Sequence, residues 1–223
     1  MPKRSHSALL IVAAFAAGLA AGPAHAAENG PAEVVARVNA ALIEVMRNAD
    51  QLGYQGRYRS LEPVLTDAFN LPLMAAVSVG KYWRELDGAQ RGRLVSAFSR
   101  MSVGTFASRF DGYGGERFEI LGNQKGPRKS VLVRNQIVKS DGETVQINYL
   151  LKTFKDRWRV VDIYLDAKYS EMALRRSEYT AVVANEGLDG LIRRIEQKLS
   201  DWAAEGERGS PAATTCALKA DSN

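Results

Sequence analysis

The sequence predicts an α+β fold in which a four-stranded, or slightly larger, antiparallel sheet packs against several helices. Three observations predict it. Apolar residues recur at helical spacing from residue 31 to about residue 110. The period changes to two between residues 117 and 165. Helical spacing then returns between residues 172 and 199, so the order is helices, strands, helices.

The N-terminal segment is predicted to be a signal peptide of residues 1–26. Lys3 and Arg4 precede a short apolar run, and Ala24-His25-Ala26 fits a signal peptidase site. The run is shorter than the ~20 residues of a membrane span, and an uncleaved anchor is the alternative. A single domain is expected over 27–204, with a disordered tail over 205–223 that holds the only cysteine, Cys216. These features predict that the protein is exported.

Removal of the signal peptide changes the chemistry that the chain can offer. It takes away two of the 30 basic residues, none of the 25 acidic residues, and both histidines, which leaves a net charge of +3. A nucleic-acid partner is therefore not expected. A single cysteine forms no internal disulfide and no Cys-rich metal site. No metal or cofactor is predicted.

Four helices are expected before the strands. The first begins at Pro31 and reaches about residue 49, and residues 52–56 interrupt the pattern. A second helix follows to Phe69, with Pro63 marking either its kink or its start. A third covers 70–83. In the fourth, Asp87 is the predicted N-cap with Gln90 three residues later, and the glycine-rich stretch 111–115 ends it.

The strands alternate apolar and polar residues. The alternation is clear around Phe118, around Val131 and from Val145 to Leu151, and it resumes at Trp158. Turns at Asp141-Gly142 and Lys155-Asp156 predict an antiparallel meander. Two amphipathic helices separated by Gly187 complete the domain.

No enzyme signature is present. The chain lacks a histidine-based triad, a phosphate loop and a dinucleotide fingerprint, and Gly112, Gly114 and Gly115 follow a helix, as a turn would. Asp162 has the parity of Val160 and is the one carboxylate that could face a cavity. Pairing with an arginine, or a place at the sheet rim, is the preferred reading of Asp162.

Apolar side chains are abundant around the predicted sheet and could all face one interior. The pattern alone leaves open whether that interior is filled or hollow. The residues concerned are Leu73, Met74 and Val77 on one helix, Phe98, Met101 and Phe106 on another, and Tyr149, Leu151, Val161 and Ile163 on strands.

Several stretches in order resemble the MlaC, or toluene-tolerance, family of periplasmic lipid-binding proteins. FNLPLMA at 69–75 and VGKYWR at 79–84 are similar to two family motifs. Trp158 with VVDI at 160–163, and EGLDGLI at 186–192, continue the match. Residues 166–179 depart from the usual pattern and, with GYQGRY at 53–58, look most like the hopanoid-associated HpnM branch.

This resemblance implies a lipid carrier with an apolar pocket between sheet and helices, and no enzyme. The ligand would be a hopanoid or a phospholipid, and the partners an inner-membrane transporter and an outer-membrane complex. The ten apolar residues named above become candidate pocket walls, and five arginines become candidates for contact with phosphate or acidic partners: Arg84, Arg91, Arg109, Arg175 and Arg176.

Two other functions stay open at this point. One is a periplasmic adaptor module with a solid core that docks on a membrane transport complex and carries nothing. The other is an enzyme that uses a buried carboxylate such as Asp162. The volume of the interior distinguishes the carrier from the adaptor.

Overall fold

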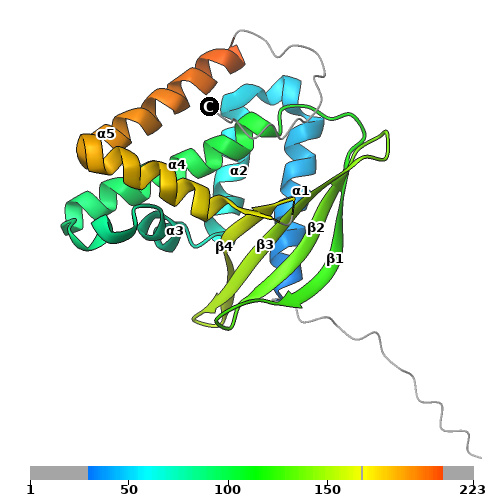
Figure 1. Cartoon of the computed structure of the whole chain (residues 1–223). Coiled ribbons are helices and arrows are strands. Elements are labelled where there is room, and N and C mark those ends of the chain that lie inside the picture. The colour runs from blue at the N-terminus through cyan, green and yellow to red at the C-terminus, as the bar shows by residue number, and fades with distance from the viewer. Residues whose placement is uncertain (1–29, 167, 208–223) are drawn as a thin grey trace, which may run out of the picture.

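One layer of the fold is an antiparallel meander of five strands, as the computed structural model in Figure 1 shows. The structure describes residues 30–166 and 168–207; the predicted signal peptide, most of the predicted tail and Cys216 lie outside them. The strands are β1 (Arg117–Lys125), β2 (Val131–Val138), β3 (Thr144–Phe154), β4 (Arg157–Leu165) and β5 (Tyr169–Ser170), and they neighbour one another in that order.

The helices precede and follow this sheet. α1 lies across one face of the sheet, and the other helices gather on the side of β4 (Figure 1). They are α1 (Pro31–Arg47), α2 (Ala49–Ala68), α3 (Leu71–Ser78), the 3-10 helix η1 (Gly80–Arg84), α4 (Gly88–Arg109) and α5 (Glu171–Glu207). The predicted α+β class and antiparallel sheet are therefore confirmed.

Two glycines interrupt the helices α2 and α5. α2 and α5 each run through one residue with non-helical backbone, Gly53 (φ 55°, ψ −176°) and Gly187 (φ 68°, ψ −177°). Only glycine adopts this region readily. The predicted interruptions therefore appear as kinks between two helical halves. Pro63 neither starts a helix nor coincides with this break, because α2 runs through it.

The predicted third helix is shorter than expected. α3 ends at Ser78, and Gly80 with φ 55° turns the chain into η1. The next helix begins as predicted: the Asp87 carboxylate accepts from the Gln90 backbone N–H at 2.8 Å, and the Gln90 side chain accepts from the Asp87 N–H at 2.9 Å. This reciprocal pair satisfies two backbone donors at the start of α4.

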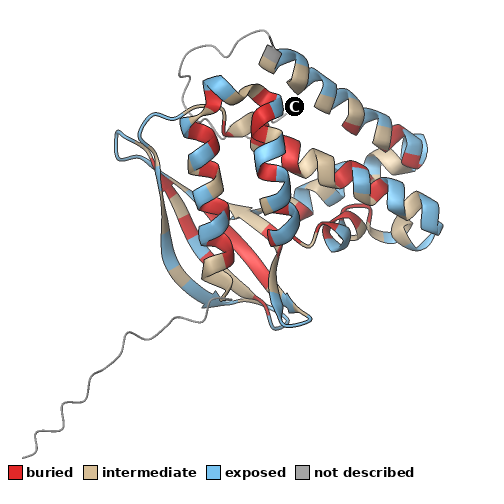
Figure 2. Cartoon of the chain, turned by 180° about the vertical axis from the view of Figure 1, so that it is seen from behind, coloured by how far each residue is buried: buried red, intermediate tan, exposed pale blue. Residues whose placement is uncertain are grey.

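One part of the core lies between α1 and the inner face of the sheet, and the core continues among the other helices. Val35, Val38 and Leu42 recur on one stripe of α1 and are fully buried, as is Val133 on β2. Figure 2 shows buried and exposed residues alternating along the helices that lie over the sheet. Burial of each such side chain contributes about 1.5–3 kcal/mol.

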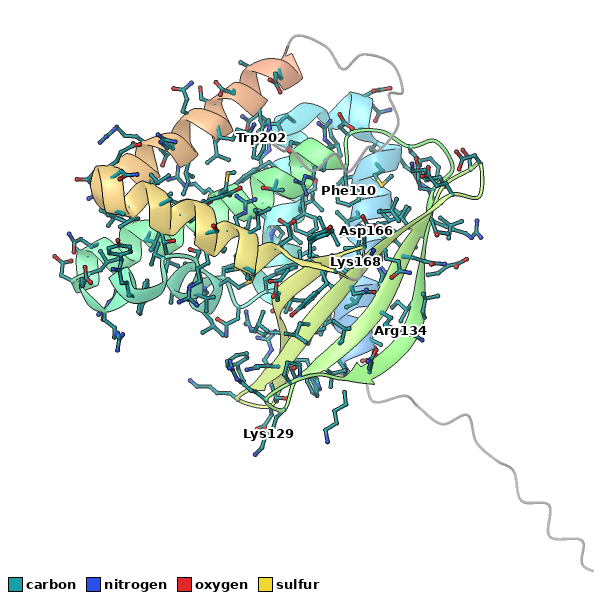
Figure 3. The ribbon with its side chains drawn as sticks, in the orientation of Figure 1. Phe110, Lys129, Arg134, Asp166, Lys168 and Trp202 are labelled. Carbon is teal, nitrogen blue, oxygen red and sulfur yellow. The ribbon has the colours of Figure 1, made fainter. Side chains whose placement is uncertain are left out.

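A row of aromatic rings crosses the interior between β3 and β1. Tyr149 lies edge-on to Phe69 with ring centroids 6.4 Å apart, and Phe69 lies edge-on to Phe106 at 5.7 Å. Phe106 stacks on Phe110, labelled in Figure 3, at 5.9 Å, and Phe110 reaches Phe118 at 6.2 Å. The row ties the ends of α2 and α4 to both strands, and each pair adds about 0.5–1.5 kcal/mol beyond its buried area.

Candidate functional site

The start of α3 is attached directly to β4. Phe69 forms a parallel bridge with Val160, and the Asn70 N–H donates to the Val160 carbonyl at 2.9 Å. The Asn70 side chain then accepts from the Leu73 N–H at 3.2 Å and caps the helix. The position of α3 relative to the sheet is therefore fixed at its first residue.

The start of α5 is held by Asp162 on β4. One carboxylate oxygen accepts from the Ile163 N–H at 2.8 Å and from the Met172 N–H at 3.1 Å. The other accepts from the Ser170 hydroxyl at 2.7 Å. The Ser170 oxygen in turn accepts from the Ala173 N–H at 2.9 Å, as a helix-capping residue does. Asp162 therefore joins β4, β5 and the first turn of α5.

Asp162 is a buried carboxylate with only 8% of its surface exposed. Burial raises its pKa above the usual value, and this effect outweighs the three hydrogen bonds, which lower the pKa. Of its four lone-pair positions, the three hydrogen bonds use three. Among the described residues it makes no ion pair with an arginine or a lysine, so the pairing that was one of the two preferred expectations is not formed. It borders a cavity instead.

That cavity is an open hollow of about 510 Å³ between the end of α3, β4–β5 and the start of α5. Its wall is apolar along Val77 and Met172 and polar along Ser177 and Thr180. Asp162 and Arg176 bring opposite charges to it. The full lining is Val77, Asp162, Ser170, Met172, Ala173, Arg176, Ser177 and Thr180.

Arg176 lies at the exposed side of this hollow, beside η1. A Cβ placed on Gly80 would lie 3.0 Å from Arg176 Nε, so the guanidinium lies close to the Gly80 backbone. In the part of the chain that the structure describes, Arg176 makes no ion pair within 4.0 Å. Its backbone carbonyl accepts from the Thr180 hydroxyl at 2.6 Å, which leaves the lone pairs of that hydroxyl available.

The neighbouring arginine on α5 points elsewhere. Arg175 donates to the Tyr179 hydroxyl at 3.2 Å and to the Thr105 hydroxyl of α4 at 3.4 Å. Burial lowers its pKa, but Tyr179, Glu171 and the other neighbours outweigh burial and raise it. Arg175 therefore joins α5 to α4 and remains charged at neutral pH.

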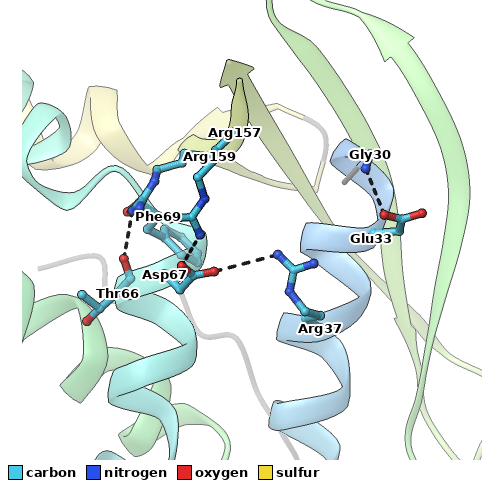
Figure 4. Close-up of polar contacts among 8 residues, drawn as sticks. All are labelled: Gly30, Glu33, Arg37, Thr66, Asp67, Phe69, Arg157 and Arg159. Carbon is cyan, nitrogen blue, oxygen red and sulfur yellow. Dashed lines mark hydrogen bonds and ion pairs between the residues drawn. The ribbon is translucent and has the colours of Figure 1, made fainter. Parts of the chain in front are cut away.

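A second hollow, of about 540 Å³, lies beside an ion-pair network (Figure 4). Asp67 at the end of α2 pairs with Arg157 of β4 and, at 3.9 Å, with Arg37 of α1. Arg159 donates to the Thr66 carbonyl at 3.1 Å and also to the Phe69 carbonyl. These arginines join two helices to β4. Four of the five residues that line the hollow have polar or charged side chains: Glu62, Pro63, Thr66, Asp67 and Arg159.

Of the predicted wall residues, the structure brings Val77 to the first hollow. Leu73, one turn earlier on α3, is 37% exposed. Apart from Val161, the other wall residues lie in or against the packed core. Met74, Phe98, Tyr149 and Leu151 are buried, and Met101, Phe106, Val161 and Ile163 are partly buried.

Most of the lining residues that the sequence did not single out lie on the first turns of α5, and Ser170 lies on β5. Met172, Ser177 and Thr180 recur at helical spacing and share one face of that helix. The helical spacing of these residues could be predicted from the sequence. The elements that this face of α5 lies beside could not, because they depend on the direction in which α5 leaves β5.

Two kinds of site are absent from the described residues. No three or more Asp, Glu, His or Cys side chains gather there as metal ligands would. No helix within them is long and apolar enough to cross a membrane.

Comparison with known protein families shows to which family this chain belongs. The family described as MlaC protein matches residues 36–197, which is most of the chain. The chain belongs to the MlaC family. No curated protein matches this MlaC-family chain.

A solved structure has the same fold as this MlaC-family protein. It is the phospholipid-binding protein of Ralstonia solanacearum, determined in complex with a phospholipid. The two chains superpose with a TM-score of 0.68 at 15% identity, over 78% of this chain and 99% of the other. At that identity the likeness establishes the fold of the MlaC-family chain.

Proposed function

We propose that this MlaC-family protein is a periplasmic lipid carrier that covers the apolar part of a hopanoid or a phospholipid and shuttles it between membrane complexes. Family membership and the phospholipid-bound structure of the same fold support lipid binding. An inner-membrane transporter and an outer-membrane complex are the proposed partners.

The single observation that carries the proposal is the part-apolar hollow beside α3. Val77 in its wall is 39% exposed and Leu73 nearby is 37% exposed, so apolar surface faces solvent at its edge. Met172 on α5 lines it, and methionine side chains adapt to ligands of variable shape. The predicted walls Phe98, Met101 and Phe106 lie on α4, which contributes no residue to the lining of this hollow.

The energetics of lipid transfer require such a carrier. Each methylene exposed to water costs about 0.8 kcal/mol, so two ~16-carbon tails exposed in water cost about 25 kcal/mol. A polycyclic hopanoid costs a similar order. Covering these groups needs an apolar lining and no catalytic side chain, which is consistent with a chain that has no recognisable enzyme motif.

Native mass spectrometry of the mature protein purified from its own periplasm, followed by organic extraction, tests the proposal. We expect one lipid per chain, and its mass separates a hopanoid from a phospholipid. A protein that stays free of lipid after incubation with both classes would instead support the alternative, an adaptor module that docks on a transport complex.

A further inference from the structure

We propose that the hollow beside α3 is a head-group site for a zwitterionic phospholipid whose amine carries N–H donors, with Asp162 binding the ammonium and Arg176 the phosphate. This inference rests on the proposed function, because it assigns the polar end of the carried lipid. It selects a phosphoethanolamine-type head group over neutral polycyclic lipids and over phospholipids without an amine.

The first step is that the hollow holds two opposite charges that form no ion pair with each other. Asp162 and Arg176 both line it, and no ion pair within 4.0 Å joins them. Asp162 is bound by three neutral donors only, and Arg176 has no acidic partner among the described residues. A ligand with one positive and one negative group complements both.

The second step is the burial of Asp162. A carboxylate that is 8% exposed has lost most of its water, and a buried charge is stabilised by a partner of opposite charge. One lone-pair position remains for a donor that enters from the hollow. A primary ammonium supplies both the charge and an N–H, whereas a quaternary ammonium supplies only the charge.

The third step is the position of Arg176. It lies on the same face of α5 as Met172 and Thr180 and close to the Gly80 backbone. A guanidinium offers two parallel N–H donors to a phosphate, and the Ser177 and Thr180 hydroxyls in the same wall add polar contacts. The anion therefore fits the exposed side of the hollow and the cation its buried side.

The fourth step is where the tails begin. Val77 forms the apolar part of the wall, and Leu73 lies one turn away on α3. A lipid whose head group occupies the polar wall therefore meets apolar side chains of α3 at its glycerol end. A soluble head-group molecule without tails would leave these apolar side chains uncovered.

The test measures binding of lipids with identical 16-carbon tails to delipidated mature protein: phosphatidylethanolamine, phosphatidylcholine, phosphatidylglycerol and diacylglycerol. Loss of one charge-assisted hydrogen bond costs about tenfold in affinity. We expect phosphatidylethanolamine to bind about tenfold more tightly than phosphatidylglycerol or phosphatidylcholine. Equal affinities for these three would overturn the inference.

Two variants assign the roles. Asp162→Asn should remove the preference for phosphatidylethanolamine over phosphatidylglycerol. Arg176→Gln should weaken all three phospholipids about tenfold and leave diacylglycerol unchanged. The matched control is Arg193→Gln, an exposed arginine on the same helix but away from the hollow. Arg176→Gln that behaves like Arg193→Gln would overturn the phosphate assignment.

Further measurements distinguish failure of this inference from failure of the proposed function. If Asp162→Asn fails to fold, the lipid ranking of the wild type and Arg176→Gln still decide the inference. Glycerophosphoethanolamine alone should bind far more weakly than the lipid, and equal binding would mean a site for small molecules instead. If no lipid binds, including diacylglycerol and a hopanoid, the proposed function fails; binding without head-group preference rejects only this inference.

Discussion

The side-chain amide of Asn39 on α1 donates a 2.8 Å hydrogen bond to Oδ1 of Asn135 on β2, in the interior between helix and sheet. Both residues are buried, with 7% and 0% of their surfaces exposed. The bond leaves Asn39 Oδ1 and Asn135 Nδ2 without a partner. This pair fixes how α1 lies on the sheet, and each side chain depends on the other to satisfy its polar atoms.

The first prediction concerns this pair. Asn39→Leu should lower the free energy of unfolding by about 1–3 kcal/mol, because Asn135 keeps its buried amide and loses its partner. Urea denaturation measures the change. The double variant Asn39→Leu/Asn135→Leu should recover part of the loss, since no buried polar group is then orphaned. A double variant that loses the sum of the two single effects would contradict this view of the pair.

The second prediction concerns the kink of α5. Gly187→Ala should destabilise the protein, because alanine at φ 68° and ψ −177° is strained by about 1–3 kcal/mol. Gly92→Ala in α4 is the matched control: both glycines are exposed and neither would bring a Cβ within 4 Å of another group. Gly92→Ala should stabilise by about 0.5–1 kcal/mol. Thermal unfolding distinguishes the two, and equal shifts would reject backbone conformation as the cause.

The third prediction concerns the wall of the hollow. Val77→Trp should abolish lipid co-purification while the protein stays folded, because the larger side chain fills the hollow from a position that is already 39% exposed. Leu121→Trp on β1 is the control, since Leu121 is 41% exposed but lies away from the hollow. Met101→Trp, deeper on α4, tests whether the tails reach that helix. Lipid content after extraction is the readout, and unchanged content rejects the wall assignment for that residue.

The fourth prediction concerns pH. Burial raises the pKa of Asp162 above 3.8, so the folded protein holds this proton more tightly than the unfolded chain. The contribution of Asp162 to the free energy of unfolding therefore falls as pH rises from 3.8 through the folded-state pKa. Urea denaturation of wild type and Asp162→Asn across this window should give a difference that shifts against the wild type as pH rises. A difference independent of pH would contradict it.

The local features of this fold were readable from the sequence. Period-two alternation and the turn at Asp141-Gly142 predicted the meander, and the capping pair of Asp87 and Gln90 predicted the start of α4. Gly187 predicted a break, and the structure has a kink there. Each of these depends on residues a few positions apart, so no tertiary information was needed.

The candidate site was harder to predict from the sequence than the fold. Met74 and Val77 belong to the same apolar stretch, yet one is buried and the other lines the hollow, because packing of α3 against α4, α5 and β4 decides which side is covered. Asp162 was expected to pair with an arginine or to lie at the sheet rim, whereas its hydrogen-bond partners are Ser170 and the backbone N–H groups of Ile163 and Met172. Such contacts follow from where α5 leaves the sheet, and no local pattern encodes that direction.

The outer strand of the sheet carries a further consequence. β1 is an edge strand, with Ile120 and Leu121 exposed, and unpaired edges of this kind invite strand addition and aggregation. The register shift between Ile120 and Gly122, where φ is 120°, interrupts the regular row of backbone donors and acceptors along that edge. The bulge therefore protects the chain against edge-to-edge polymerisation, and a substitution that straightened it would favour fibrous association between copies.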